Sequence, residues 1–251
     1  MRTKVKTAAE IRAMRTAGQM LATVLKVVAA AAEPKITTKA LADVAAKELK
    51  SLGGKPAFLG HEGFPDVICI SVNEEIVHGI PSTKKVIQNG DIIGLDFGVS
   101  YEGLLTDGAI SVIVGETSDA AVKKLIEVTK NSLEAGIAAV HDKVRVGDIS
   151  TVIERAIQSQ GRYGIPKELV GHGIGRYLWE EPNIPNYGHG GSGFILEAGM
   201  TIAVEPMVTL GTDRIRLKDD GWTIASADGS WAAHFEHTVL ITTDGVEILT
   251  Q

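Results

Sequence analysis

Apolar residues recur every three or four positions in two stretches near the amino terminus, a spacing that predicts two amphipathic helices. The first helix is expected to begin after Thr7, whose hydroxyl is a suitable cap, and to end at Glu33-Pro34. The second is expected to begin near Thr37 or Thr38 and to end at Gly53-Gly54, because successive glycines supply a stop.

The same order of elements returns later in the chain. A long helical pattern opens at Thr117-Ser118 and a shorter one at Gly147-Asp148, each about 110 residues after its counterpart. This spacing is too long for a solenoid repeat, so we expect two similar halves, about residues 1–115 and 116–251, within one domain spanning 1–251. The predicted class is α+β, with helices covering one face of a shared sheet.

Runs of β-branched and other apolar residues predict the strands of that sheet. Three of them are residues 67–72, 200–205 and 235–241. Residues 91–114 contain two further runs on either side of a short turn, which predicts a hairpin.

The hairpin contains two aspartates among apolar residues. A turn at Tyr101 and Glu102 would pair Ser100 with Gly103 and set Asp96 opposite Asp107, with their Cβ atoms about 4.5–5.5 Å apart. Facing carboxylates repel and are costly to bury, and a cation between them would resolve both problems. A slip of one residue would instead leave one aspartate buried and the other solvated, so the hairpin alone leaves both arrangements open.

Composition describes an ordinary globular protein, with 251 residues, 44% hydrophobic residues, 22% charged residues and 8 prolines. The net charge of −6 argues against non-specific nucleic-acid binding, which needs a basic surface. Cys69 is the single cysteine, so a reducing compartment and a cytoplasmic location are expected. The apolar run at residues 20–32 is short and contains Lys26, so we expect neither a signal peptide nor a membrane span.

Three more ionisable residues lie among apolar residues or glycines in the second half. Glu205 follows Val204 and Glu236 follows Phe235 in predicted strands, where a glutamate should be paired or bound to a metal. His172 lies between two glycines, a setting that suits either a ligand approaching the backbone or a structural turn. The glycine spacing there is not the G-x-G-x-x-G pattern of dinucleotide-binding proteins.

Together, Asp96, Asp107, His172, Glu205 and Glu236 supply four carboxylates and one imidazole. This oxygen-rich set suits two divalent ions such as Mn, Fe(II), Co or Zn, bridged by carboxylates. Such a pair lowers the pKa of a bridging water and polarises a carbonyl, which is the chemistry of amide hydrolysis.

Six motifs in this order resemble those of the type I methionine aminopeptidases over almost the whole chain. They are Val77-His78-Gly79-Ile80-Pro81, Asp96-Phe97-Gly98, Thr106-Asp107-Gly108, Gly171-His172-Gly173-Ile174-Gly175, Val204-Glu205-Pro206-Met207 and Phe235-Glu236-His237-Thr238. The resemblance implies the pita-bread fold, in which two pseudo-symmetric halves with a mostly antiparallel sheet surround a dinuclear metal centre. It implies a single catalytic domain that removes N-terminal methionine from peptides and nascent proteins.

The resemblance also implies a role for each matching residue. Asp96 would hold one metal ion and His172 with Glu205 the other, while Asp107 and Glu236 would bridge both. Glu205 would also handle the proton of the attacking water. His78 would hydrogen-bond the scissile amide. The residues at the positions of the family's methionine pocket are Phe58, His61, Phe64, Cys69, Leu178 and Trp222.

The chain departs from the family pattern at the substrate site. Trp179 stands before Glu180-Glu181-Pro182, where the family has a second histidine that contacts the substrate carbonyl. Because an indole donates one hydrogen bond but carries no proton, transition-state stabilisation should be weaker. His61 stands where an aromatic residue is usual and Phe58 where a smaller one is usual, so the pocket is expected to be narrower or more polar. His189, in the following glycine-rich loop, is a candidate replacement for the histidine.

These departures motivate an alternative, a pita-bread homologue that binds metal but has weak, absent or altered N-terminal specificity. A non-enzymatic binding module would have to explain why all five ligand positions are present, and prolidase-like relatives fit the pocket positions less well. The expected partner is the N-terminus of a peptide or nascent protein, and neither a nucleic acid nor a membrane. A monomer is expected, whereas transient ribosome association is left open.

Overall fold

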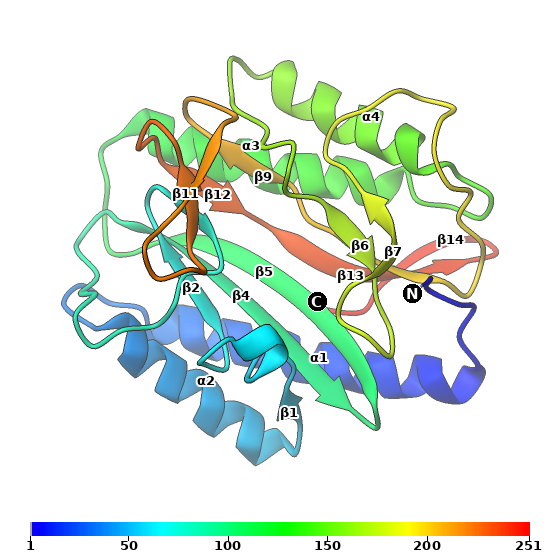
Figure 1. Ribbon diagram of the computed structural model, residues 1–251, viewed down its shortest axis with the longest axis horizontal. Coiled ribbons are helices and arrows are strands. Elements are labelled where there is room, and N and C mark those ends of the chain that lie inside the picture. Colours follow the sequence, from blue (N-terminus) through cyan, green and yellow to red (C-terminus); the bar gives the residue numbers. More distant parts are fainter. Residues whose placement is uncertain (1) are drawn as a thin grey trace.

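The centre of the molecule is a nine-stranded sheet in which every strand pair is antiparallel (Figure 1). The computed structural model describes residues 2–251. Along the sheet the strands are β1 (Lys55–Pro56), β4 (Ile92–Tyr101), β5 (Leu104–Ile113), β13 (Glu236–Thr242), β8 (Thr201–Val204), β6 (Gly171–Gly173) and β7 (Glu180–Ile184). In addition, β2 (Cys69–Val72) pairs with β4, and β14 (Gly245–Ile248) pairs with β13.

Two smaller sheets and a short 3-10 helix lie outside the nine-stranded sheet. One sheet has the order β10 (Ile215–Leu217), β11 (Ile224–Ser226) and β3 (Glu75–Val77), and the other pairs β12 (Ala232–His234) with β9 (Met207–Thr209). The 3-10 helix η1 (His61–Gly63) lies in the loop before β2. All five of these strands have only three residues, too few for a period-two pattern, and the sequence did not predict them.

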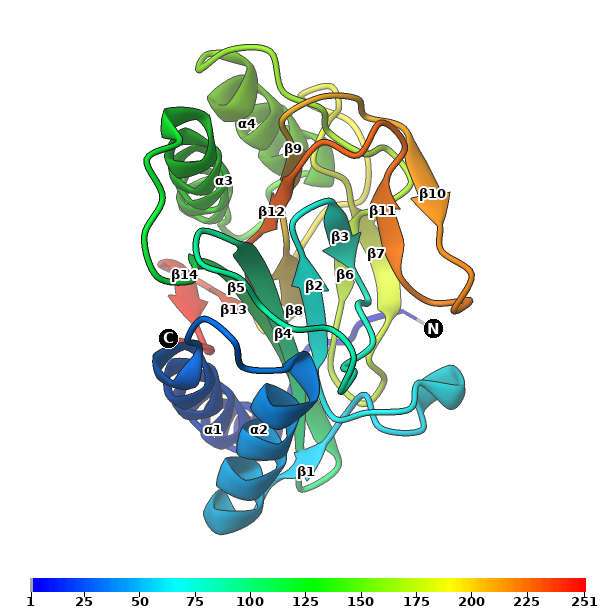
Figure 2. The same ribbon diagram turned by 90° about the vertical axis from the view of Figure 1, so that its left-hand side faces the viewer.

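Four helices cover the sheet, α1 (Ala8–Ala31), α2 (Thr38–Leu52), α3 (Ala120–Ala138) and α4 (Val146–Gln158). The predicted caps of the first two are confirmed, because the Thr7 hydroxyl accepts from the N–H of Glu10 and Thr37 accepts from that of Ala40. Gly53 ends α2 at a φ of 81°, a backbone conformation that glycine adopts without steric cost. Figure 2 shows both helix pairs on one side of the curled sheet, with β10 and β11 on the other.

The start of α3 differs slightly from the prediction. Its cap is Asp119 rather than Thr117-Ser118, because the Asp119 carboxylate accepts from the N–H groups of Ala121 and Val122. The fourth helix opens beside Gly147-Asp148 as expected, and the Asp148 carboxylate accepts from the N–H of Arg145. Each helix pair buries its own apolar layer, with Leu21 packed in the first and Ile153 in the second.

The predicted register of the hairpin is wrong. Asp96 lies opposite Ala109 and Asp107 opposite Gly98, since the turn falls at Glu102-Gly103. Glu102 and Gly103 have φ values of 51° and 78°, so both have the positive φ of a type I′ turn, which matches the twist of the flanking strands. The aspartates are therefore diagonal neighbours on one face. Both are buried, so the alternative of one solvated aspartate is also wrong.

The two halves of the sequence meet in the middle of the large sheet. Strand β13 pairs with β5 through Glu236 opposite Ala109 and His237 opposite Gly108, and pairs with β8 on its other side. The α+β class is confirmed, whereas the division into two similar halves stays a prediction. Within residues 2–251, no helix is both long and apolar enough to cross a bilayer.

Candidate active site

The five predicted metal ligands line one cavity of about 410 Å³. They come from separate elements: Asp96 lies on β4, Asp107 on β5, His172 on β6 and Glu236 at the start of β13, while Glu205 directly follows β8. All five side chains are buried. Pairing of the sheet therefore brings together residues that are far apart in the sequence.

Hydrogen bonds to the backbone hold two of these residues in place. The Thr238 hydroxyl accepts from the N–H of Asp107 and donates to its carbonyl, at 2.9 and 2.8 Å. Nδ1 of His172 lies 2.9 Å from the carbonyl oxygen of Gly173, and because a carbonyl only accepts, Nδ1 carries the proton. The lone pair of the neutral ring is then on Nε2, which lies 3.4 Å from Oε1 of Glu205.

The side chains form two groups in which three donor atoms lie within 4.8 Å of one another. One group is Asp107, His172 and Glu236, and the other is Glu205, His234 and Glu236. Oδ1 of Asp96 and Oε1 of Glu236 are buried without a hydrogen-bond partner, although buried carboxylate oxygens are normally paired. Unpaired carboxylate oxygens around a neutral imidazole fit divalent cations.

The site is also unfavourable for four negative charges on their own. Burial raises the pKa of Asp96 to about 7. Burial, reinforced by the neighbouring carboxylates, raises the pKa values of Asp107, Glu205 and Glu236 well above their ordinary range. Burial lowers the pKa of His172 to about 4, which keeps its ring neutral, the form that binds metal.

His234 was not among the predicted site residues. It ends β12, and its Nε2 lies 3.7 Å from Oε2 of Glu205 and 3.8 Å from Oε2 of Glu236. Its signal in the sequence was its place two residues before Glu236 in an apolar run, because residues two apart in an extended chain face the same side.

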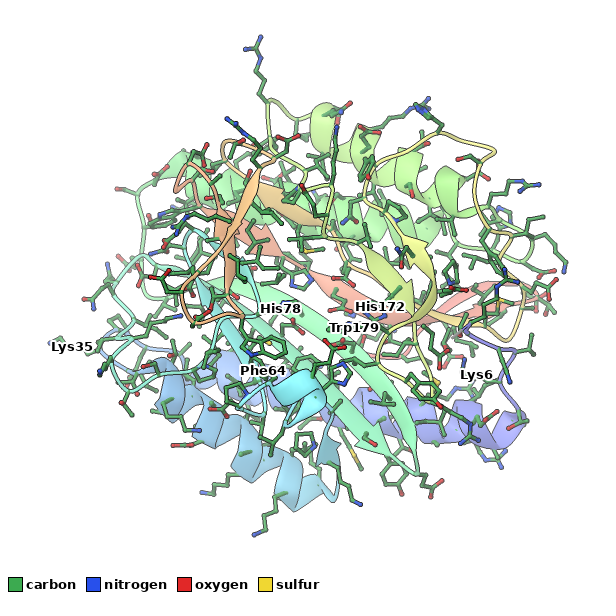
Figure 3. The ribbon with its side chains drawn as sticks, viewed as in Figure 1. Lys6, Lys35, Phe64, His78, His172 and Trp179 are labelled. Carbon is green, nitrogen blue, oxygen red and sulfur yellow. The ribbon has the colours of Figure 1, made fainter. Side chains whose placement is uncertain are left out.

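An apolar pocket adjoins the carboxylates, and all six residues of the predicted methionine pocket line the same cavity. The Phe58 and Phe64 rings meet edge to face with centroids 6.4 Å apart, and Phe64 meets Trp222 in the same way at 5.2 Å. Cys69 lies opposite Asp96 in the β2–β4 ladder, and burial raises the pKa of its thiol. Figure 3 shows Phe64, His78, Trp179 and His172 near the middle of the molecule.

A model of metallopeptidase family M24 matches residues 12–243. The chain belongs to this family. It is 43% identical over 250 residues to methionine aminopeptidase 1 of Mycobacterium tuberculosis, covering 98% of this chain and 94% of the relative. The methionine aminopeptidase of Clostridium acetobutylicum is 43% identical, with 98% of each chain covered.

Solved structures agree with this assignment. The crystal structure of methionine aminopeptidase from Thermotoga maritima has a TM-score of 0.97 and 44% identity, covering 99% of each chain. Prolidase from Pyrococcus furiosus shares the fold at a TM-score of 0.79 with 21% identity. The predicted resemblance to the methionine aminopeptidases, the pita-bread fold and the metallo-exopeptidase class are confirmed.

Trp179, which is expected from the sequence to stand in place of a family histidine, is a partly exposed indole in this M24 enzyme. Trp179 is 43% exposed and meets His61 edge to face, with ring centroids 4.8 Å apart. The ring of His78 is 6.4 Å from the indole, and burial lowers its pKa to about 4. Among the described residues, His189 is not one of those that line the cavity, and the carbonyl of His189 accepts from Ser192 near the start of α4.

Proposed function

We propose that the protein removes N-terminal methionine from peptides and nascent proteins with two bound divalent ions, Mn, Fe(II), Co or Zn. The observation that carries the proposal is that one cavity contains both a set of metal-binding side-chain types and an apolar pocket. Four buried carboxylates and a neutral imidazole lie beside an apolar pocket of aromatic and aliphatic side chains. A flexible, polarizable thioether suits such a pocket.

In this proposal, Asp96 holds one ion, His172 and Glu205 hold the other, and Asp107 and Glu236 bridge them. The bound ions would polarise the scissile carbonyl and lower the pKa of the attacking water. The aspartates fit a shared role because they are diagonal neighbours on one face of the hairpin. Glu236 fits a bridging role because it belongs to both groups of donor atoms.

The chain itself would manage the protons and the leaving group. Glu205 is the proposed proton acceptor, because its buried carboxylate lines the cavity beside the other proposed ligands. His78 faces the same cavity and is the proposed hydrogen-bond partner of the scissile amide. The rings of Phe58, Phe64 and Trp222 would exclude water from the methionine side chain and hold the peptide in register.

A second candidate function rests on Trp179. An indole N–H donates one hydrogen bond and cannot become a cation, so it stabilises a developing oxyanion less than an imidazole does. The second candidate is therefore a homologue that binds metal but cleaves methionine weakly or prefers another N-terminal residue. The polar ring of His61 within the pocket also favours this second candidate.

The test is turnover of a Met-Ala-Ser peptide beside a Leu-Ala-Ser peptide, with each of the four metals added to stripped protein. We expect metal-dependent release of methionine and little release of leucine. Asp107→Asn should abolish the activity, whereas His141→Gln, at an exposed position, should leave it unchanged. Metal binding without turnover of the methionyl peptide would favour the second candidate, and failure to bind any metal would overturn both.

The biological setting is part of the same proposal. We propose a cytoplasmic, monomeric enzyme that acts on newly made chains, and the single cysteine supports the reducing compartment. Ribosome association would be tested by co-sedimentation with ribosomes at low and physiological salt.

A further inference from the structure

A second imidazole faces the metal-binding carboxylates. His234 is 3% exposed, and its Nε2 is buried without a hydrogen-bond partner. The two atoms nearest to it among the ion-pair contacts are Oε2 of Glu205 at 3.7 Å and Oε2 of Glu236 at 3.8 Å. Buried ring nitrogens are normally paired, so this one calls for an explanation.

The backbone holds His234 firmly in this position. The Ser111 hydroxyl on β5 accepts from the N–H of His234 and donates to its carbonyl, each at 2.9 Å. Strand pairing sets His234 opposite Met207, and β12 leads directly into β13 (Figure 1). Because these bonds use only the backbone, Nε2 remains available to a ligand.

Direct hydrogen bonds do not account for the contacts of Nε2. An N–H···O hydrogen bond is about 2.7–3.2 Å long, and both distances here exceed that range. Oε1 of Glu236 is also buried without a partner. A cation between the imidazole and the carboxylates would satisfy these neighbouring groups together.

The distances fit shared coordination. Two donors at about 2.0–2.2 Å from one ion are at most about 4.4 Å apart. The separations of 3.7 and 3.8 Å lie within that limit, and Glu205, His234 and Glu236 form one group of donor atoms. Glu205 would then contact a histidine through each oxygen, since Oε1 lies 3.4 Å from Nε2 of His172.

We propose that Nε2 of His234 is a sixth protein ligand of the metal centre and coordinates an ion that it shares with Glu205 and Glu236. This inference rests on the proposed dinuclear centre and adds a ligand to it. A second imidazole moves the donor set away from the all-oxygen sites preferred by Mn and toward ions that bind nitrogen well, such as Zn, Co and Fe(II).

The direct test is NMR of the natural protein labelled with ¹⁵N-histidine, stripped and reloaded with ¹¹³Cd. A coordinated ring nitrogen shows scalar coupling to the metal, and the chain has only seven histidines to resolve. We expect coupling at Nε2 of two histidines. His234→Gln should remove one coupled signal, and the matched variant His237→Gln, one residue past Glu236, should retain both.

The outcomes separate this inference from the proposed function. Coupling at one histidine, unchanged in His234→Gln, would overturn the sixth ligand and leave the dinuclear centre standing. Coupling at no histidine would overturn both. If His234→Gln does not fold, His234→Asn serves as the second variant, and melting of the stripped proteins checks folding in each case.

Metal affinity provides an independent measurement. Loss of groups that merely orient a metal ligand costs about 10–100-fold in affinity, so losing a ligand should cost at least that for Zn. His234→Gln should therefore weaken Zn binding by at least about tenfold and Mn binding by less. Equal weakening of both metals, or none, would contradict the assignment.

Discussion

The indole of Trp179 packs edge-on against the imidazole of His61, with ring centroids 4.8 Å apart and planes at 78°. His78 lines the same cavity, with its ring centroid 6.4 Å from that of Trp179 and 6.4 Å from that of Trp222. Trp179, the predicted departure from the family motif, is thus part of an aromatic cluster rather than a free surface side chain. Any residue placed at this position has two imidazoles as neighbours.

Trp179→His should raise kcat on a methionyl peptide while metal content stays the same. An imidazole can donate to the developing oxyanion and carry a positive charge, whereas the indole cannot. Loss of one such donor typically costs about 10²–10³ in rate, and the gain should be smaller because His61 is packed around the larger ring. Steady-state kinetics that separate kcat from KM would measure the effect.

The matched control is Trp179→Phe, which keeps an aromatic ring and removes the N–H donor. It should lower kcat or leave it unchanged. If Trp179→His has the same kcat as the natural protein, and the natural protein already turns over rapidly, another group must stabilise the oxyanion.

Removing the metal ions should destabilise the protein. The clustered carboxylates repel one another in the stripped site, and a ligand that binds only the folded state adds RT ln(1 + [L]/Kd) to its stability. At a free metal concentration about 100 times Kd this is about 2.7 kcal/mol. Thermal melting with and without chelator would show the shift, and metal analysis should find less metal in Asp107→Asn than in the natural protein.

A melting temperature that ignores chelator would contradict this prediction. Equal metal content in the natural protein and in Asp107→Asn would remove the bridging role proposed for Asp107.

The stability of the stripped protein should fall as the pH rises above about 6.5. Burial raises the pKa of Asp96 to about 7 and raises those of Asp107, Glu205 and Glu236 further from their ordinary values. The folded state therefore keeps protons that the unfolded chain loses near pH 4, a contribution to stability that disappears as the pH passes the folded values.

Histidines oppose this trend at lower pH. Burial lowers the pKa values of His78, His172 and His237 to about 4 and that of His234 to about 3. Between about pH 4 and 6.5 these histidines therefore carry protons in the unfolded chain but not in the folded one, so stability from the histidines rises with pH. In this range that gain offsets the stability lost through the carboxyl groups, and the net loss of stability is confined to higher pH. Melting of stripped and metal-loaded protein at pH values above about 6.5 should show a decline in the stripped sample alone, and parallel curves would contradict the prediction.

Replacing Glu102 by asparagine should stabilise the hairpin. Glu102 has a φ of 51°, and a side chain such as glutamate pays about 1–2 kcal/mol for the left-handed region that asparagine visits more readily. Because Asn-Gly is the preferred type I′ pair, Glu102→Asn should raise the free energy of unfolding by about 1 kcal/mol. Urea unfolding would measure it, and Gly103→Ala should shift the midpoint the opposite way.

The sequence predicted those parts of the fold that depend on local periodicity. The caps at Thr7 and Thr37 followed from hydroxyl chemistry at the start of an apolar pattern. The hairpin register did not follow, since the positive φ of Glu102 is imposed by strand twist and is not typical of glutamate. Strands of three residues carry too little pattern to be detected.

The sequence also predicted which carboxylates gather in one cavity, whereas their metal-binding roles stay a prediction. The carboxylates were recognisable because an acid among apolar residues needs a partner, and the motifs assigned roles to them. His234 was missed because its proximity to Glu205 depends on the pairing of β12 with β9, a contact between two three-residue strands. The packing of Trp179 against His61 likewise depends on how two loops meet across the cavity.

The junction between β5 and β13 also has a kinetic consequence. Glu236 lies in that junction, opposite Ala109, and is the last of the five predicted ligands along the chain. A growing chain on the ribosome therefore lacks the complete ligand set until β13 has emerged and docked between β5 and β8. An ion that joins both sides of this junction would act mainly by slowing unfolding, provided that the contacts it strengthens form after the folding transition state.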